Sequence, residues 1–180
     1  MVKSGSTKGA LGFIGGILII IAMFTSWLTG ASKFLNTTIS GFGVYSIAEI
    51  NINSVILPLM NAGILILVGG IVAVLVGGLM LSKVIVSSNY RIGFFLLLIA
   101  GAMSLIGFFI WIGSASNVNS GFGFSSNLFN NTTLSLGLWF ALFGAILAIL
   151  DGVLYLVTSR KSSTRSSSKS SRSKKSRSKK

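Results

Sequence analysis

Four long apolar runs, separated by polar segments, dominate the hydrophobicity pattern of this 180-residue chain. Each run is continuously apolar rather than alternating, and each is long enough to cross the hydrocarbon core of a bilayer, which takes roughly 20 helical residues. Because a backbone in lipid must satisfy its own hydrogen bonds, the pattern predicts transmembrane helices. The predicted spans are about Ala10–Gly30, Val55–Leu81, Ile92–Gly113 and Leu134–Val157.

The basic residues that flank these runs predict the orientation of the chain. Lys3 and Lys8 precede the first run, and Lys83 and Arg91 lie between the second and the third. Ten more basic residues follow the fourth run, whereas the other intervening segments hold only Lys33. Because Lys and Arg concentrate on the cytoplasmic side, we expect a multi-pass protein of the cell membrane with both termini in the cytoplasm. Its parts are a short N-terminal segment (1–9), a transmembrane domain (10–157) and a tail (158–180).

Tryptophans and glycosylation sequences agree with this orientation. Trp27, Trp111 and Trp139 fall at the expected outer ends of their helices, where indole rings prefer the membrane interface. Three Asn-x-Ser/Thr sequences lie in the expected outer segments and are candidate glycosylation sites, beginning at Asn36, Asn130 and Asn131.

The first run also fits a second interpretation. A basic start, the apolar stretch from Gly9 to Phe24 and the small residues Thr29-Gly30-Ala31 are the pattern of a cleaved signal peptide, whose removal would leave three spans. Against this, the chain resembles itself at an offset of about 80 residues. Gly12-Phe13 recurs as Gly93-Phe94, and each expected outer segment contains Gly-Phe-Gly. The repeat predicts two helical hairpins in one four-helix bundle.

Small residues recur at a spacing of seven along the expected helices. Helices in lipid associate where small residues let their backbones approach, and a spacing of seven keeps those residues on one side of the helix. We therefore expect a tight antiparallel bundle without a wide pore. The predicted helix-packing residues are Gly63, Gly70, Gly77, Gly93, Gly107, Gly137 and Gly144.

The composition excludes most enzyme chemistry. Charged residues make up only 9% of the chain, and His and Cys are absent. Without them there is no imidazole base, no thiolate, no zinc site and no disulfide. Glu49 and Asp151 are the only two carboxylates. We expect no catalytic residues, no metal and no cofactor.

Few polar residues fall inside the spans. Asp151 is the only ionisable one, and an intramembrane carboxylate is a candidate proton or cation site. The simpler interpretation is a carboxylate near the inner interface, hydrated or paired with Lys83, Arg91 or the tail. Asn61 predicts an interhelical hydrogen bond. In the outer segments we expect short strands, with Thr38–Val44 the clearest, that pair as a small sheet.

The residues after Thr158 form a tail of Ser, Thr and basic residues without a single apolar side chain. Such a segment cannot bury surface, so we expect it to be disordered. Its basic residues predict binding to anionic lipid at the inner leaflet. Nucleic acid, either ribosomal RNA or a packaged genome, is an alternative partner, and a third interpretation is a solvated tail that only fixes topology. The predicted polyanion-binding residues are Arg160, Lys161, Arg165, Lys169, Arg172, Lys174, Lys175, Arg177, Lys179 and Lys180.

Two segments carry a resemblance to small, uncharacterised prokaryotic and archaeal four-helix membrane proteins. These are Phe24-Thr25-Ser26-Trp27, with Ser26 where that group usually has Pro, and Gly137-Leu138-Trp139-Phe140. The layout, with cytoplasmic termini and a longer first outer loop, also resembles that of claudin-like tetraspan proteins. That family's paired cysteines are absent, so the resemblance implies no paracellular-barrier function.

Together these patterns predict an all-α membrane protein of four transmembrane helices in an antiparallel bundle, with a disordered basic tail. We expect a structural or accessory-subunit protein that binds anionic partners at the inner membrane face, as a homo-oligomer or part of a membrane complex. The alternatives are a small transporter or channel component that uses Asp151, and a viral envelope protein whose tail contacts the genome.

Overall fold

The structure is a computed structural model that describes residues 9–31, 36–47, 52–82, 90–117 and 133–154. Most of these residues are helical, as expected. The helices are α1 (Ala10–Phe24), α2 (Leu57–Leu81), α3 (Tyr90–Asn117) and an unlabelled C-terminal helix (Leu136–Leu154). Three of them, α2, α3 and the C-terminal helix, are long and apolar enough to cross a membrane, whereas α1 is apolar but has 15 residues.

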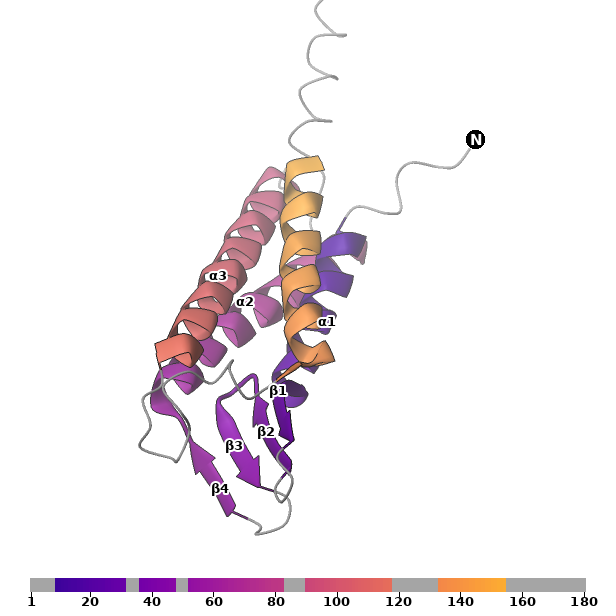
Figure 1. Cartoon of the computed structure of the whole chain (residues 1–180). Helices are drawn as coiled ribbons and strands as arrows, with labels where there is room; N and C mark the ends of the chain where they lie inside the picture. Colours follow the sequence, from indigo (N-terminus) through magenta and orange to yellow (C-terminus); the bar gives the residue numbers. More distant parts are fainter. Residues whose placement is uncertain (1–8, 32–35, 48–51, 83–89, 118–132, 155–180) are drawn as a thin grey trace, which may run out of the picture.

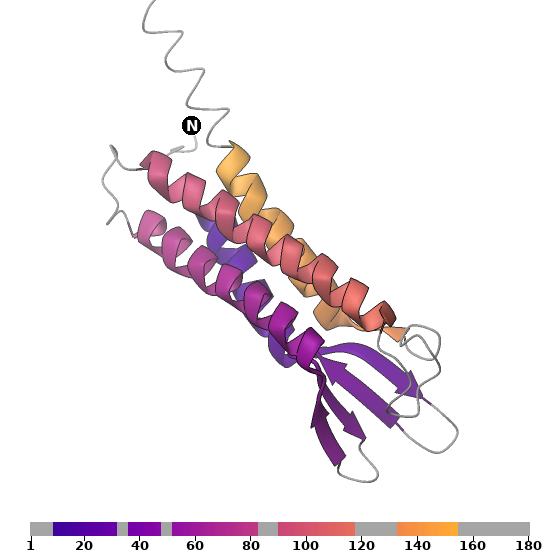
Figure 2. The ribbon, with the colours of Figure 1, turned by 90° about the vertical axis from the view of Figure 1, so that its left-hand side faces the viewer.

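The four helices lie side by side and form what we call the helical region (Figures 1 and 2). α1 lies against α2 and the C-terminal helix, and α3 lies against the same two helices on its own side. The outward faces carry large apolar side chains, including Leu75, Phe95 and Phe109, each at least 60% exposed. A surface this apolar on every helix is typical of a protein that lipid surrounds.

A five-stranded antiparallel sheet stands at one end of the helical region (Figure 1). Its strands are β1 (Ser26–Ala31), β2 (Asn36–Ser40), β3 (Val44–Ile47), β4 (Ile52–Val55) and β5 (Thr133–Leu134). The order is β4-β3-β2-β1-β5. β5, from the segment before the C-terminal helix, therefore pairs with β1, the first strand along the chain.

The sheet corrects two sequence-based expectations. The small sheet expected in the outer segments is present. The fold is nevertheless not all-α, because the described part of the segment between α1 and α2 is largely strand. The stretch Thr38–Val44, expected as one strand, contains the end of β2, a turn at Gly41–Gly43 and the start of β3. Gly43 adopts φ 70°, a conformation that side chains beyond glycine disfavour, and its N–H donates to the Ser40 carbonyl oxygen at 2.9 Å.

The first predicted helix is also too long. It was expected to reach Gly30, but α1 ends at Phe24 and β1 begins at Ser26. Thr25 is extended, with φ −99° and ψ 163°, and its N–H and Oγ1 both donate to the Ala22 carbonyl oxygen, at 3.2 and 2.9 Å. Apolar continuity could not reveal this end, because the buried residues of β1 continue the apolar run.

The other helix boundaries differ by a few residues. α2 begins at Leu57, because Val55 pairs with Val44 in the sheet. α3 extends beyond Ile92–Gly113 at both ends. The last helix begins at Leu136 because Leu134 pairs with Leu28, and its expected end at Val157 lies outside the described residues.

Candidate functional site

Asp151, the carboxylate predicted to lie inside a span, is at the end of the helical region that is remote from the sheet. It is 6% exposed, on the last described turn of the C-terminal helix. Its Oδ2 accepts a hydrogen bond of 2.8 Å from the backbone N–H of Gly12, the third residue of α1. Asp151 therefore joins the last described helix to the first.

The start of α1 lacks any cap of its own. Gly9 occupies the N-cap position with φ 85° and no side chain, and the first turn holds no acidic residue. The first N–H groups of a helix have no intrahelical acceptor and form the positive end of its dipole, where a carboxylate is favourable. Asp151 supplies that carboxylate from a neighbouring helix.

Glycine at position 12 makes the approach feasible. A Cβ there would lie 3.2 Å from Oδ2 of Asp151 and 2.7 Å from a methyl carbon of Leu97. The absence of a side chain leaves the N–H of Gly12 open to a carboxylate that comes from outside the helix. The geometry gives Asp151 a structural task, the N-terminal cap of α1.

The surroundings of Asp151 resemble a packed core more than an ion pathway. Ser104 is the other buried polar residue of the described chain, and its hydroxyl is directed at the carbonyl oxygens of Ala100 and Ile66, at 3.1 and 3.3 Å. Among the residues that the structure describes, no three His, Cys, Asp or Glu come together as metal ligands. Arg91, a suggested partner, is exposed at the start of α3, and Lys83 lies outside the described residues.

The seven glycines expected to pack helices are all buried. Gly70 and Gly77 of α2 face α1, where added Cβ atoms would lie 2.6 Å from Ile19 Cγ2 and 2.6 Å from the Phe13 nitrogen. Gly107 of α3 faces α2, and Gly144 of the C-terminal helix faces α1.

Two of these glycines contact the chain beside the sheet, and one of them, Gly63, also contacts Met23 of α1. Gly63 lies against the carbonyl oxygen of Gly41, and Gly137 lies against Thr25 and Trp27. Gly93 is buried in the first turns of α3.

The sequence did not predict Gly15 as a packing residue, although it faces the predicted Gly144. A Cβ on Gly15 of α1 would lie 2.5 Å from the Gly144 carbonyl oxygen, and a Cβ on Gly144 would lie 2.5 Å from that of Gly15. Gly101 of α3 was also missed, and it packs on Ala145 and Ile149. The spacing of seven does not include these positions, although a pair such as Gly15-Gly16 could have marked two contact faces on one helix.

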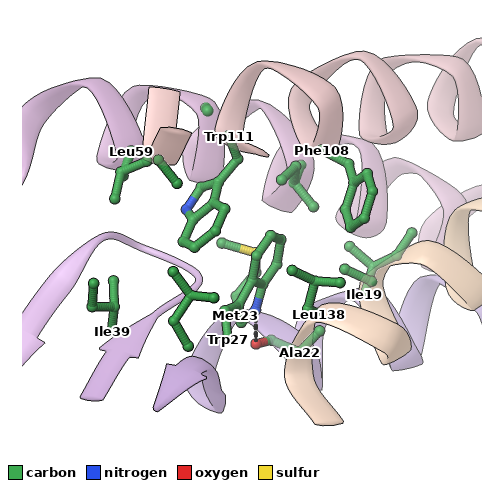
Figure 3. Packing of buried hydrophobic residues seen from close by; sticks show 14 of the residues in the cluster. Ile19, Ala22, Met23, Trp27, Ile39, Leu59, Phe108, Trp111 and Leu138 are labelled. Atoms are coloured by element: carbon green, nitrogen blue, oxygen red, sulfur yellow. Dashed lines mark hydrogen bonds between the residues drawn. The ribbon is translucent and has the colours of Figure 1, made fainter. Parts of the chain in front are cut away.

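Trp27 forms the joint between the sheet and the helices (Figure 3). Its indole N–H donates to the Ala22 carbonyl oxygen at 2.7 Å, and its ring centroid lies 4.7 Å from that of Trp111. Both side chains are fully buried among apolar residues of both regions. The interpretation of these two tryptophans as interfacial anchors is therefore wrong, whereas Trp139 is 43% exposed.

The two buried indoles differ in hydrogen bonding. Trp111 is fully buried, and its Nε1 has no acceptor among the described residues. Trp27 and Trp111 are thus both fully buried in one apolar cluster, but of the two only Trp27 has a bonded N–H among the described residues.

Asn61 does not form the interhelical bond expected of it. Its side chain is exposed on the outer surface of α2, one turn from the start of the helix. Its amide has no hydrogen bond within the described part of the chain.

The remaining predicted residues divide between the sheet and the undescribed segments. Asn36 begins β2, opposite Ala31 of β1. Asn130, Asn131 and all ten basic tail residues lie outside the described residues.

Comparisons with known proteins do not place the chain in a family. No protein-family model matches it, and a search of curated proteins found no significant relative.

Proposed function

We propose that this chain is a four-span membrane protein with both termini in the cytoplasm, acting as a structural or accessory subunit whose basic tail binds the anionic inner face of the membrane. The observation that carries the proposal is the charge of the tail: ten Lys and Arg and no carboxylate after Asp151. Near an anionic leaflet each basic residue contributes about 1 kcal/mol to attraction.

The packing of α1 supports four spans over three spans and a cleaved leader. At 1.5 Å per residue α1 extends about 22 Å, less than a bilayer core of about 30 Å. Its start is nevertheless buried: an added Cβ on Gly9 would lie 2.8 Å from the Gly77 carbonyl oxygen of α2. Loss of this helix would leave Asp151 without its partner Gly12.

The buried polar groups favour a structural role over transport. Asp151 caps a helix and Ser104 bonds backbone carbonyls, so both have structural partners. Small apolar residues and glycines fill the contacts between helices. We include in the proposal the two-hairpin repeat and the claudin-like layout. The latter is supported by the longer outer segment, which contributes four of the five strands.

The proposal is tested by reconstituting the full chain in neutral nanodiscs and adding neutral or anionic vesicles. We expect the full chain to bind anionic vesicles at low salt and to release them at high salt. A matched variant with the ten tail Lys and Arg replaced by Gln should not bind. Equal binding by both proteins would refute the tail's role. Recovery of nucleic acid in preference to the vesicles, when a cell lysate is added, would shift the partner to RNA or DNA.

The transporter alternative rests on the burial of Asp151 and has its own test. Asp151→Asn keeps an acceptor oxygen for the Gly12 N–H and removes the charge. Loss of a proton- or cation-dependent flux in vesicles of this variant would support transport. We expect Asp151→Asn and the unaltered chain to behave alike.

A further inference from the structure

The exposed face of α2 differs from the outer faces of the other helices. Among the helix residues whose exposure the structure describes, Asn61 is the one exposed polar residue apart from Arg91 at the start of α3. A side-chain amide has two N–H donors and a carbonyl acceptor, all of which need partners where water is scarce.

Asn61 belongs to a regular stripe along α2. The exposed residues of this face follow one another at steps of four and three, which is the a/d pattern of helices that pair with a small left-handed crossing. The exposed faces of α3 and the C-terminal helix follow the same steps, so the side chains of the stripe, and not their spacing, distinguish it. The stripe consists of Leu57, Asn61, Ile64, Val68, Ile71 and Leu75.

The stripe also differs from the other outer faces in that it contains no aromatic ring. It contains only Leu, Ile, Val and the single Asn, and half of these side chains are β-branched. The outer faces of the other helices carry exposed aromatic rings, at Phe24, Phe95, Phe109, Trp139 and Phe143. A row of short branched side chains lets a second helix approach evenly along its length.

We propose that the α2 stripe is the contact between two copies of this chain in the same membrane, with their Asn61 amides hydrogen-bonded to each other. Two copies inserted in the same direction are related by an axis along the membrane normal, which places both Asn61 residues at one depth. An amide is complementary to a second amide, because each supplies a donor and an acceptor. One polar residue in an apolar a/d stripe also fixes the register of the pair.

The absence of Cys from the chain allows a clean crosslinking test. In bilayers at low protein density, we expect oxidation of Ile64→Cys in the full-length protein to give a disulfide-linked dimer. The matched control is Ile106→Cys on α3, which is 56% exposed against 45% for Ile64. It lies at a similar depth, because its neighbour Gly107 packs against Ala62 and Ile66. This control should remain monomeric.

A second substitution tests the role of the amide. Asn61→Leu should lower the dimer yield of Ile64→Cys about fivefold, in line with the modest strength of polar contacts between membrane helices. No dimer from Ile64→Cys, equal dimer from both cysteines, or an undiminished yield with Asn61→Leu would overturn the proposal.

The inference rests on membrane insertion but not on the tail. Water-soluble maleimide should fail to label either cysteine in intact vesicles; labelling of both would refute the membrane topology rather than the dimer. Replacing the ten basic tail residues with Gln should leave the Ile64→Cys dimer unchanged, which separates this inference from tail binding.

Discussion

The contacts between the helices and the joint between the helices and the sheet are built from residues of opposite size. Between α1 and the C-terminal helix, Gly15 and Gly144 bring two backbones together with no side chain between them. At the joint, the large rings of Trp27, Trp111 and Phe108 fill the space between strands and helix ends, with centroids 4.7 and 6.1 Å from that of Trp27.

This difference follows from what drives each contact. Lipid is as apolar as a side chain, so helices in lipid gain little by burying Leu and associate through close packing. The joint connects a sheet with helix ends, whose faces differ in shape, and aromatic rings fill such a space with large buried area. Glycines also contribute to the joint, because Gly41 and Gly137 both pack against the Trp27 side chain.

The largest expected effect is at the helix contact. Gly144→Ala would place a Cβ 2.5 Å from the Gly15 carbonyl oxygen, and backbone cannot yield as a side-chain end can. We expect a loss of about 3 kcal/mol in the free energy of unfolding, measured in lipid or mild detergent.

Gly113→Ala is the matched control for this substitution. A Cβ there meets nothing within 4 Å, so the higher helix propensity of alanine should stabilise the protein by up to about 1 kcal/mol. Equal effects of the two substitutions would show that close backbone approach is unimportant.

The joint is tested by comparing its two buried tryptophans. Both Trp27→Phe and Trp111→Phe remove ring volume, but only Trp27 loses a hydrogen bond, to the Ala22 carbonyl oxygen. We expect Trp27→Phe to cost about 2 kcal/mol and Trp111→Phe about 1 kcal/mol, the difference being one hydrogen bond. Thermal unfolding followed by the remaining tryptophan fluorescence measures both, and the reverse order would contradict the assignment.

The cap at the N-terminal end of α1 is tested by substitutions of Asp151. Asp151→Leu removes the acceptor for the Gly12 N–H, and we expect a loss of about 1 kcal/mol, as for other helix caps. Asp151→Asn should lose less, because it keeps a side-chain oxygen. Hydrogen exchange at the Gly12 amide should be faster in the Leu variant, and unchanged exchange would argue against the cap.

The smallest effect is expected at the edge of the sheet. Thr29 Oγ1 lies 2.9 Å from Thr133 Oγ1, and Thr133 Oγ1 donates to the Thr29 carbonyl oxygen at 3.1 Å. Thr133→Val keeps the shape and should cost no more than about 0.5 kcal/mol, because water can replace these exposed bonds. A larger loss of thermal stability would mean that β5 holds the two outer segments together.

The chain predicts much of its helical region without the structure. Continuous apolar runs marked three long helices, because residues that face either lipid or one another are apolar on all sides. The same property hid the end of α1, since the buried strand β1 continues the apolar run from Ile19 to Leu28. The strands before α2 were harder still, because only their turn at Gly41–Gly43 gives a local signal.

Composition alone limited the chemistry, since a chain without His or Cys and with two carboxylates has few reactive groups. What Asp151 does was decided by tertiary structure, because its partner Gly12 is 139 residues away and is a backbone N–H that no sequence pattern marks. The same holds for Trp27 and Asn61, whose positions suggested an interface and a buried bond. Which face of an apolar helix is covered depends on its neighbours, so burial places Trp27 inside and leaves Asn61 on the outer surface of α2.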